Sequence, residues 1–276
     1  MGIKITTLIE NKDGNCDLNG EFGLSLLIED EDISFIFDTG KTGKFLENAK
    51  KMNLDLKDIK HIILSHGHYD HTGGLKTFVE NCSSDFTLYI SKNFFDEKYR
   101  INSLVNTFLG NNFNKKYIED NNIEIHFIED DEFKFSKNIT LFTNFKSLND
   151  FEKPTPYYFK KIYNNYILDK MEDEIVIGID TQKGLLIICG CSHIGIVNII
   201  ENIKQRTNKK IFGIIGGLHL SKAENSRIEK IIDYFIANEI KFLGVSHCTG
   251  DLFIEKLKEH NFDFIYNNTG NIFNFE

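Results

Sequence analysis

The sequence has no apolar run long enough to cross a membrane and no cysteine pattern typical of a disulfide framework. No segment approaches the roughly eighteen uninterrupted apolar residues of a membrane span. The five cysteines are an odd number, and Cys189-Gly190-Cys191 is C-x-C, not the redox motif C-x-x-C. Residues 1–10 alternate polar and apolar side chains and lack the apolar region of a signal peptide. We therefore expect a protein of the reducing cytoplasm without a membrane segment.

Basic side chains are fewer than acidic ones. The chain carries 41 acidic against 32 basic side chains, and its formal net charge of -9 disfavours nonspecific binding to nucleic acid. A small anionic substrate would need metal ions, or local lysine and arginine side chains, to offset that charge. The 276 residues are 41% hydrophobic and 26% charged, which is ordinary for a globular protein. We expect a single domain spanning residues 1–276 with a sizeable core.

The densest cluster of chemically active side chains follows the apolar run 59–64, which reads as a buried strand. His66, His68, Asp70 and His71 lie within six residues, and the neighbouring glycines permit a tight backbone. Crowding keeps one ion from being wrapped by all four side chains. We therefore expect two adjacent ions, one facing His66 and His68 and the other facing Asp70 and His71. Imidazole and carboxylate ligands suit Zn, Mn or Fe. The alternative is a histidine-rich surface loop.

Three later apolar strands repeat this layout. After the strands predicted at 184–189, 211–215 and 242–245 come His193, His219 and His247. Sites in sheet-containing enzymes commonly lie at the C-terminal ends of strands. Any one of these histidines alone is more often a partly buried structural residue, but together they predict a shared site. The remaining histidines, interpreted as surface residues in polar or helical contexts, are His61, His126 and His260.

The segment 91–170 is rich in phenylalanine and tyrosine interleaved with lysine, and it holds both prolines, Pro154 and Pro156. This composition fits the wall of a pocket for a flat ring, and it fits ordinary core and lid packing equally well. We expect a variable insertion or lid region here, with the prolines marking an irregular connection.

The HxHxDH pattern of residues 66–71 resembles the metallo-beta-lactamase superfamily. This resemblance implies an α/β fold, the αββα four-layer sandwich, with two metal ions at one edge and 91–170 as an inserted aromatic-rich segment. The longer motifs SHGHYDHTGGL, GCSHIGIVN, GGLHL and SHCTG resemble the branch of archaeal synthases that join a dihydropterin to ribofuranosylaminobenzene 5'-phosphate. We therefore expect a small phosphorylated substrate, with a flat ring as one possibility.

The resemblance implies roles for individual residues. The implied metal ligands are His66, His68, Asp70, His71, His193 and His247. Asp70 and His219 are the implied catalytic residues, and direct metal ligation is the rival role of His219. The motif Asp38-Thr39-Gly40 also occurs in the superfamily. There the aspartate supports the loop that carries the metal ligands, here called the metal loop, without binding metal itself. The alternative is that Asp38 caps a helix predicted from Thr42 to Met52.

The chain departs from the superfamily pattern at four places. The superfamily usually has a third histidine in a PGHT-like turn and a bridging aspartate, and neither can be identified in this chain. Asp173 and Glu174 fall near the position of the histidine, and His193 falls near the position of the aspartate. The synthase branch also tends to have histidine where Phe22 stands, and an arginine-containing run at 143–147. The missing histidine and aspartate imply that one ion is weakly held, and the missing arginine bears on the substrate, not on the fold.

The leading hypothesis is a metal-dependent enzyme, hydrolase or transferase, that acts on a phosphorylated or pyrophosphorylated small molecule. In a synthase, two divalent ions, zinc or alternatively manganese or iron, would stabilise a departing pyrophosphate. In a hydrolase, the same ions would activate water against a phosphodiester, ester or lactone. The third reading is a di-iron redox or metal-binding protein. His68 argues against it, because that branch carries HxExD.

Overall fold

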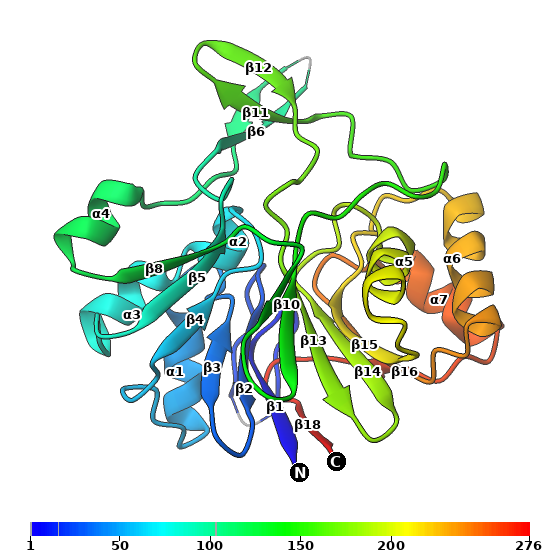
Figure 1. The fold of residues 1–276 in the computed structure, drawn as a ribbon, viewed down its shortest axis with the longest axis horizontal. Helices are drawn as coiled ribbons and strands as arrows, with labels where there is room; N and C mark the ends of the chain where they lie inside the picture. Colours follow the sequence, from blue (N-terminus) through cyan, green and yellow to red (C-terminus); the bar gives the residue numbers. More distant parts are fainter. Residues whose placement is uncertain (1, 16, 103) are drawn as a thin grey trace. The chain divides into compact units, whose positions relative to one another are not determined.

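The computed structural model describes residues 2–15, 17–102 and 104–276 (Figure 1). The chain divides into two compact units, each assembled from segments far apart in the sequence. Unit 1 comprises Met1–Glu129, Thr155–Asp173 and Asn268–Glu276, and unit 2 comprises Asp130–Pro154 and Glu174–Asn267. That all 276 residues form one domain stays a prediction. None of the helices in the described part of the chain is long and apolar enough to span a membrane.

Unit 1 contains a seven-stranded sheet in the order β18-β1-β2-β3-β4-β5-β8. Its strands are β1 (Ile3–Ile9), β2 (Ser25–Glu29), β3 (Ser34–Phe37), β4 (His61–Ile63), β5 (Thr87–Ser91), β8 (Glu124–Ile128) and β18 (Ile272–Phe275). The strands β18, β1, β2 and β3 pair antiparallel, and β3, β4, β5 and β8 pair parallel. The C-terminal ends of β3 and β4 therefore meet at one edge of the sheet.

The helices of unit 1 are short and depend on the sheet for their stability. They are α1 (Lys44–Lys51), α2 (Tyr69–Thr72), α3 (Leu75–Asn81) and α4 (Lys115–Asp120). Isolated helices of this length are marginal in water. The side chains of Phe45 on α1 and Phe78 on α3 are fully buried in one core cluster with Ile62 and Leu88 of the sheet. Each such burial contributes about 1.5–3 kcal/mol, which is what holds these helices in place.

A separate four-stranded sheet also belongs to unit 1, in the order β12-β11-β6-β7. Its strands are β6 (Glu97–Ile101), β7 (Asn106–Phe108), β11 (Tyr158–Ile162) and β12 (Asn165–Leu168). They come from the segment 91–170, which also supplies β8 to the first sheet and two strands to unit 2. Its aromatic residues divide between roles, since Phe94 is fully buried in the core whereas Tyr163 is 93% exposed. That this segment forms a lid stays a prediction.

Unit 2 contains a second seven-stranded sheet, in the order β17-β16-β15-β14-β13-β10-β9. Its strands are β9 (Glu132–Lys134), β10 (Ile139–Phe142), β13 (Val176–Thr181), β14 (Gly184–Cys189), β15 (Ile211–Gly217), β16 (Phe242–Ser246) and β17 (Ile265–Tyr266). The strands β14, β15 and β16 are parallel neighbours. Their C-terminal ends, where the sequence places three histidines, therefore lie at the same edge of this sheet.

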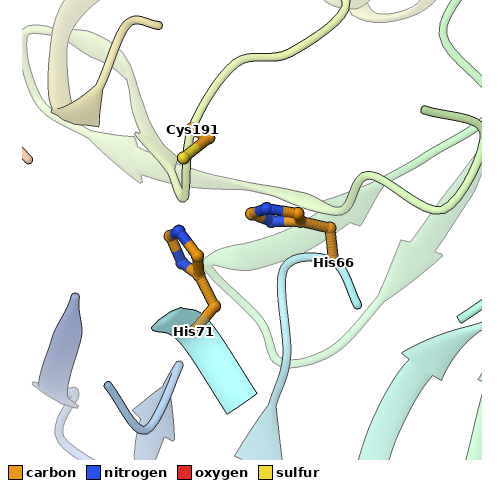
Figure 2. Close-up of side chains that lie close together, drawn as sticks. All are labelled: His66, His71 and Cys191. Atoms are coloured by element: carbon orange, nitrogen blue, oxygen red, sulfur yellow. The ribbon is translucent and has the colours of Figure 1, made fainter. Parts of the chain in front are cut away.

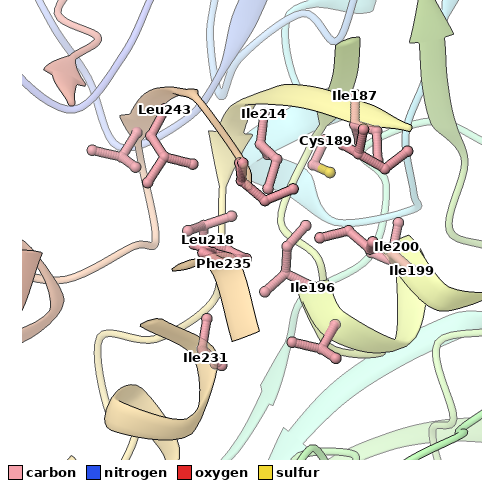
Figure 3. Close-up of a cluster of buried hydrophobic side chains, with 14 of the residues drawn as sticks. Ile187, Cys189, Ile196, Ile199, Ile200, Ile214, Leu218, Ile231, Phe235 and Leu243 are labelled. Atoms are coloured by element: carbon pink, nitrogen blue, oxygen red, sulfur yellow. The ribbon is translucent and has the colours of Figure 1, made fainter. Parts of the chain in front are cut away.

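Three helices cover one side of the unit 2 sheet (Figure 1). They are α5 (Ile196–Thr207), α6 (Asn225–Ala237) and α7 (Asp251–Glu259). Figure 3 shows their apolar side chains packed with those of the strands, among them Ile196, Ile199 and Ile200 of α5, Ile231 and Phe235 of α6, Ile187 of β14, Ile214 of β15 and Leu243 of β16. The isoleucines that α5 carries at helical spacing therefore face the sheet.

One expectation about the histidines outside the motifs is wrong. His61 is half-buried at the start of β4, and its Nδ1 lies 3.3 Å from the hydroxyl of Tyr89 on β5. Burial lowers the pKa of His61. His61 falls inside the strand predicted at residues 59–64, and its place at the start of β4 explains its partial burial. His126 and His260 are exposed, as expected.

Candidate metal centre

In unit 1 the predicted ligands lie on the loop after β4 and on the short helix α2, whose N-cap is His68. His66 and His71 are fully buried, and His68 and Asp70 are 5% and 6% exposed. The Nε2 of His66 lies 3.0 Å from the Nδ1 of His68, and the Nε2 of His71 lies 3.9 Å from Asp70 Oδ2. Figure 2 shows the rings of His66 and His71 side by side, with centroids 4.3 Å apart. The four predicted ligands of unit 1 therefore lie close together, and which of them would share an ion stays a prediction.

Asp38, at the end of β3, determines which nitrogen of the nearby histidines carries the proton. Its Oδ2 lies 2.6 Å from His71 Nδ1 and accepts the Ser65 hydroxyl at 2.7 Å. A carboxylate only accepts, so His71 donates from Nδ1 and carries its lone pair on Nε2. Because the Ser65 hydroxyl donates to Asp38, its oxygen accepts from His66 Nδ1 at 2.9 Å. Both imidazoles therefore carry their lone pair on Nε2, the nitrogen that would coordinate a metal ion.

The alternative role of Asp38 as a helix cap is wrong. The N-cap of α1 is Gly43, and both carboxylate oxygens of Asp38 bond to the metal loop, Oδ1 to the Ser65 amide at 2.7 Å. Its φ of +60° lies in the left-handed region, which aspartate and asparagine tolerate better than most residues. That Asp38 supports bound metal stays a prediction.

Asp38→Asn is expected to lower metal affinity by roughly ten- to a hundredfold while the fold is kept. Asparagine tolerates the same backbone conformation, but its amide cannot accept from Ser65 and His71 with the charge of a carboxylate. Titration with zinc in competition with a chromogenic chelator measures the affinity. Asp58→Asn, at an exposed position of the same unit, serves as the control. Equal affinities of the two variants would contradict the supporting role.

A buried ion-pair network holds the middle of the HxH loop. Asp173 accepts the Gly67 amide on Oδ2 at 2.7 Å and the Lys98 ammonium on Oδ1 at 2.8 Å. Lys98, 2% exposed on β6, also donates to Asp169 at 2.8 Å. Burial lowers the pKa of Lys98, but the charges of Asp173 and Asp169 outweigh it, so the pKa lies above its ordinary value. The loop between His66 and His68 is thus anchored to the four-stranded sheet.

Lys98→Met is expected to lower the free energy of unfolding by about 3–5 kcal/mol, because two buried carboxylates lose the cation that they share. Urea unfolding followed by circular dichroism measures the change. The matched control is Lys116→Met, which removes an ion pair with Asp120 whose side chains are 76% and 57% exposed, and it should leave the midpoint almost unchanged. Similar shifts in both variants would show that the buried network contributes little.

The four-stranded sheet also reaches the predicted ligands directly. The ring of Tyr158 on β11 packs edge-on against His68, with centroids 5.6 Å apart. The neighbouring ring of Tyr157 packs edge-on against Tyr158 at 5.3 Å. An aromatic side chain from the segment 91–170 therefore borders the metal loop in unit 1.

In unit 2, each strand that the sequence singled out is followed within three residues by a left-handed residue. Ser192 after β14, His219 after β15 and His247 after β16 have φ values of +60°, +51° and +54°. Such conformations cost non-glycine residues about 1–2 kcal/mol and cluster at functional sites. The chain therefore turns sharply where each motif begins, which brings the three loops together over one edge of the sheet.

Hydrogen bonds fix the His193 loop within unit 2. Glu174, 1% exposed, accepts the amides of His193 and Ile194 on its two carboxylate oxygens at 2.8 and 3.1 Å. The Ser192 hydroxyl donates to the carbonyl of Gly217 at 2.8 Å. The His193 and His219 rings lie 4.2 Å apart between centroids. Two histidines from different predicted motifs thus contact each other at this edge.

The same edge holds two thiols. Donor atoms of Cys191, His247 and Cys248 all lie within 4.8 Å of one another, and the two sulfurs are 3.3 Å apart. Figure 2 includes Cys191 on the loop after β14. The sequence interpretation set Cys191 aside because C-x-C is not a redox motif, and it gave Cys248 no role. Their proximity to His193 and His247 in the sequence was the available signal, but their contact depends on strand order.

The donor chemistry of unit 1 fits divalent metal ions. Three buried imidazoles and one carboxylate crowd a single loop, and hydrogen bonds to Ser65 and Asp38 orient the nitrogens of His66 and His71. Neutral imidazole with a carboxylate is a donor set typical of Zn, Mn and Fe sites.

Comparisons with known proteins agree with this geometry. A family model described as the metallo-beta-lactamase superfamily matches residues 18–83. The chain is 34% identical to the 7,8-dihydropterin-6-methyl-4-(beta-D-ribofuranosyl)-aminobenzene-5'-phosphate synthase of Methanocaldococcus jannaschii, over 99% of this chain and 97% of the relative. The chain belongs to the metallo-beta-lactamase superfamily.

Two further relatives of this metallo-beta-lactamase superfamily chain span nearly its whole length. An uncharacterized protein of Methanocaldococcus jannaschii is 29% identical over 91% of this chain and 93% of its own. The crystal structure of Tm1679, described as a metal-dependent hydrolase of the beta-lactamase superfamily, superposes with a TM-score of 0.86 and 29% identity, covering 98% of each chain. The predicted metallo-beta-lactamase fold is thereby confirmed.

The segment 143–147, where the synthase branch of the superfamily tends to carry arginine, is bound by an arginine from α5. Arg206 donates to the carbonyls of Thr143 and Asn144 at 2.7 and 3.0 Å and lies over the ring of Phe145 at 5.3 Å. Phe22, at the branch's histidine position, is 50% exposed. The guanidinium in this part of unit 2 therefore has a structural role, holding the segment against α5.

Proposed function

We propose that this metallo-beta-lactamase superfamily member is a metal-dependent enzyme acting on a phosphorylated or pyrophosphorylated small molecule. The observation that carries the proposal is the 34% identity with the dihydropterin synthase relative over 99% of the chain. The donor set of unit 1 supports metal dependence. The substrate class proposed is that of the relative, a dihydropterin joined to an aminobenzene ribose phosphate.

His66, His68, Asp70 and His71 would hold two divalent ions, zinc in the first instance. His193 and His247 are proposed as the further ligands from the sequence pattern and from family membership. The bound ions would supply positive charge that stabilises the charge developing on the phosphate oxygens. Asp38 and Ser65 keep the histidine nitrogens aimed at the ions, and Glu174 holds the backbone of the His193 loop.

His219 is proposed as the group that moves a proton. It does not occur in any candidate metal-binding group among the described residues, and its ring contacts His193. An imidazole beside cations has its protonation disfavoured by charge repulsion, so it would act as the neutral form, accepting a proton or donating to phosphate. Asp70, 6% exposed, is proposed both to bind metal and to act in catalysis.

A hydrolase is the second candidate, favoured by the whole-chain similarity to a structure described as a metal-dependent hydrolase. The same residues serve both chemistries, since each needs charge stabilisation at an oxygen that leaves or is attacked. The two candidates differ in whether a second organic substrate is required.

Metal analysis of protein purified without added metal, followed by a substrate panel, tests the proposal. Pyrophosphate released only when a pyrophosphorylated dihydropterin and ribofuranosylaminobenzene 5'-phosphate are both present would establish the synthase. Turnover of a nitrophenyl phosphodiester or a lactone without a second substrate would establish the hydrolase. Zinc-loaded or manganese-loaded protein that turns over neither set would contradict the proposal.

A further inference from the structure

Cys191 and Cys248 meet although their strands are not neighbours. Cys191 follows β14 and Cys248 follows β16, with β15 between the two strands. Strands two positions apart are separated by about 10 Å. The Cys191 and Cys248 sulfurs are nevertheless 3.3 Å apart. Both loops therefore bend over the end of β15.

The glycine pair at the end of β15 makes this approach possible. A β-carbon at Gly216, whose φ is +120°, would stand 1.9 Å from the carbonyl oxygen of Cys189. A β-carbon at Gly217 would stand 2.7 Å from Cys248 Sγ and 2.6 Å from the carbonyl oxygen of Gly190. Any side chain at these two positions would push the loops apart. The Gly-Gly of the GGLH motif thus accounts for the thiol contact.

Hydrogen bonds hold Cys248 in place. Its sulfur accepts the His219 amide at 3.2 Å, and its carbonyl accepts the amides of Leu220 and Ser221 at 3.1 and 3.2 Å. Cys191 and Cys248 are 3% and 8% exposed, so only a small reagent reaches them, Cys248 first. The cysteines that the structure describes are thiols. The pair is therefore fixed in contact and screened from large thiol reagents.

We propose that Cys191 and Cys248 are a modification site that a small hydroperoxide oxidises to a reversible disulfide. The Cys248 sulfur attacks the peroxide, the O–O bond breaks, and a sulfenic acid and an alcohol, or water from hydrogen peroxide, are formed. The Cys191 sulfur then displaces water from the sulfenic acid and the S–S bond forms. Two thiols lose two hydrogens and the peroxide is reduced. The sulfurs need to close by about 1.3 Å to reach disulfide length.

The disulfide would act on the proposed metal ligands of unit 2. Cys191 lies two residues before His193, and Cys248 directly follows His247. Closing the sulfurs moves both loops, which turn through left-handed residues at Ser192 and His247. This regulatory consequence rests on the proposed function, whereas the oxidation itself does not.

Peptide mass spectrometry tests the oxidation. Metal-reconstituted protein is treated with hydrogen peroxide near one equivalent, blocked with N-ethylmaleimide in denaturant and digested. The expected product is a cross-linked peptide pair joining Cys191 to Cys248, absent after dithiothreitol. Cys248→Ser and Cys191→Ala should each lose it, and Cys82→Ser, a half-buried cysteine of unit 1, should keep it. Circular dichroism checks that each variant is folded. Alkylation of both cysteines in every peroxide-treated wild-type sample would overturn the proposal.

Turnover measured on the same samples tests the regulatory consequence. Oxidation should lower wild-type turnover at least about tenfold, as when support of a metal ligand is disturbed, and dithiothreitol should restore it. The Cys248→Ser protein should not respond to the same peroxide. A cross-link without any loss of turnover would overturn the regulation. Absent turnover in both redox states would count against the proposed function, while the cross-link still decides the modification site.

Discussion

Replacing His68 by alanine is expected to abolish turnover and to lower bound metal while the fold is kept. The Nδ1 of His68 lies 3.0 Å from His66 Nε2, so its loss removes one donor of the first predicted pair. The backbone carbonyl of His68 accepts the amides of His71 and Thr72 at 3.0 and 3.1 Å, and these hydrogen bonds are kept in the variant. The side chain makes no cap hydrogen bond to α2. The substitution therefore separates metal binding from folding.

The loss of turnover should exceed about a hundredfold, since even a supporting partner of a metal ligand is worth up to that much. Elemental analysis after dialysis and the substrate panel measure the two effects. His260→Ala is the matched control, because His260 is an exposed histidine at the end of α7 that bonds to Glu229 at 2.8 Å. A His68→Ala protein with full metal content and full turnover would show that the HxHxDH assignment is wrong.

Removing the imidazole of His219 is expected to lower turnover by roughly two to four orders of magnitude with both metals retained, the scale of a lost acid-base group. His219 has a φ of +51°, so His219→Ala adds a backbone cost to the loss of the ring. His219→Asn is the sharper variant, because asparagine tolerates the left-handed conformation. The backbone amide that donates to Cys248 Sγ is kept in both.

Agreement between the alanine and asparagine variants would attribute the effect to the imidazole and not to the loop. The turnover rate should fall with little change in the metal content of either variant. One metal missing from folded His219→Asn protein would instead place His219 in the coordination sphere. His193 or His247 would then have to be reassigned, since six ligands already account for the proposed pair of ions.

Most elements near the site follow from local patterns. The strands after which His66, His193, His219 and His247 stand are short apolar runs bounded by turn residues, and each occurs where the sequence predicts it. The helix after Thr39 begins at Lys44, within the predicted range. Such patterns are decisive because a buried strand must be apolar and the chain must turn at its end. His61 shows the limit, since it was interpreted as a surface residue although it lies within the strand predicted at 59–64 and is half-buried.

The sequence by itself determined the family, the strand-end layout and the predicted ligands, because these depend on residues close together along the chain. Tertiary structure decided which groups support them. Asp173 reaches Gly67 across 106 residues, and Cys248 reaches Cys191 across 57. No local sequence pattern predicts either contact, because both depend on how the strands are ordered. Asp173 is held by Lys98 of the four-stranded sheet, and the two thiols lie over the Gly216-Gly217 end of β15. Long-range pairing of this kind is specified by how strands are ordered and packed, which periodicity along the chain does not encode.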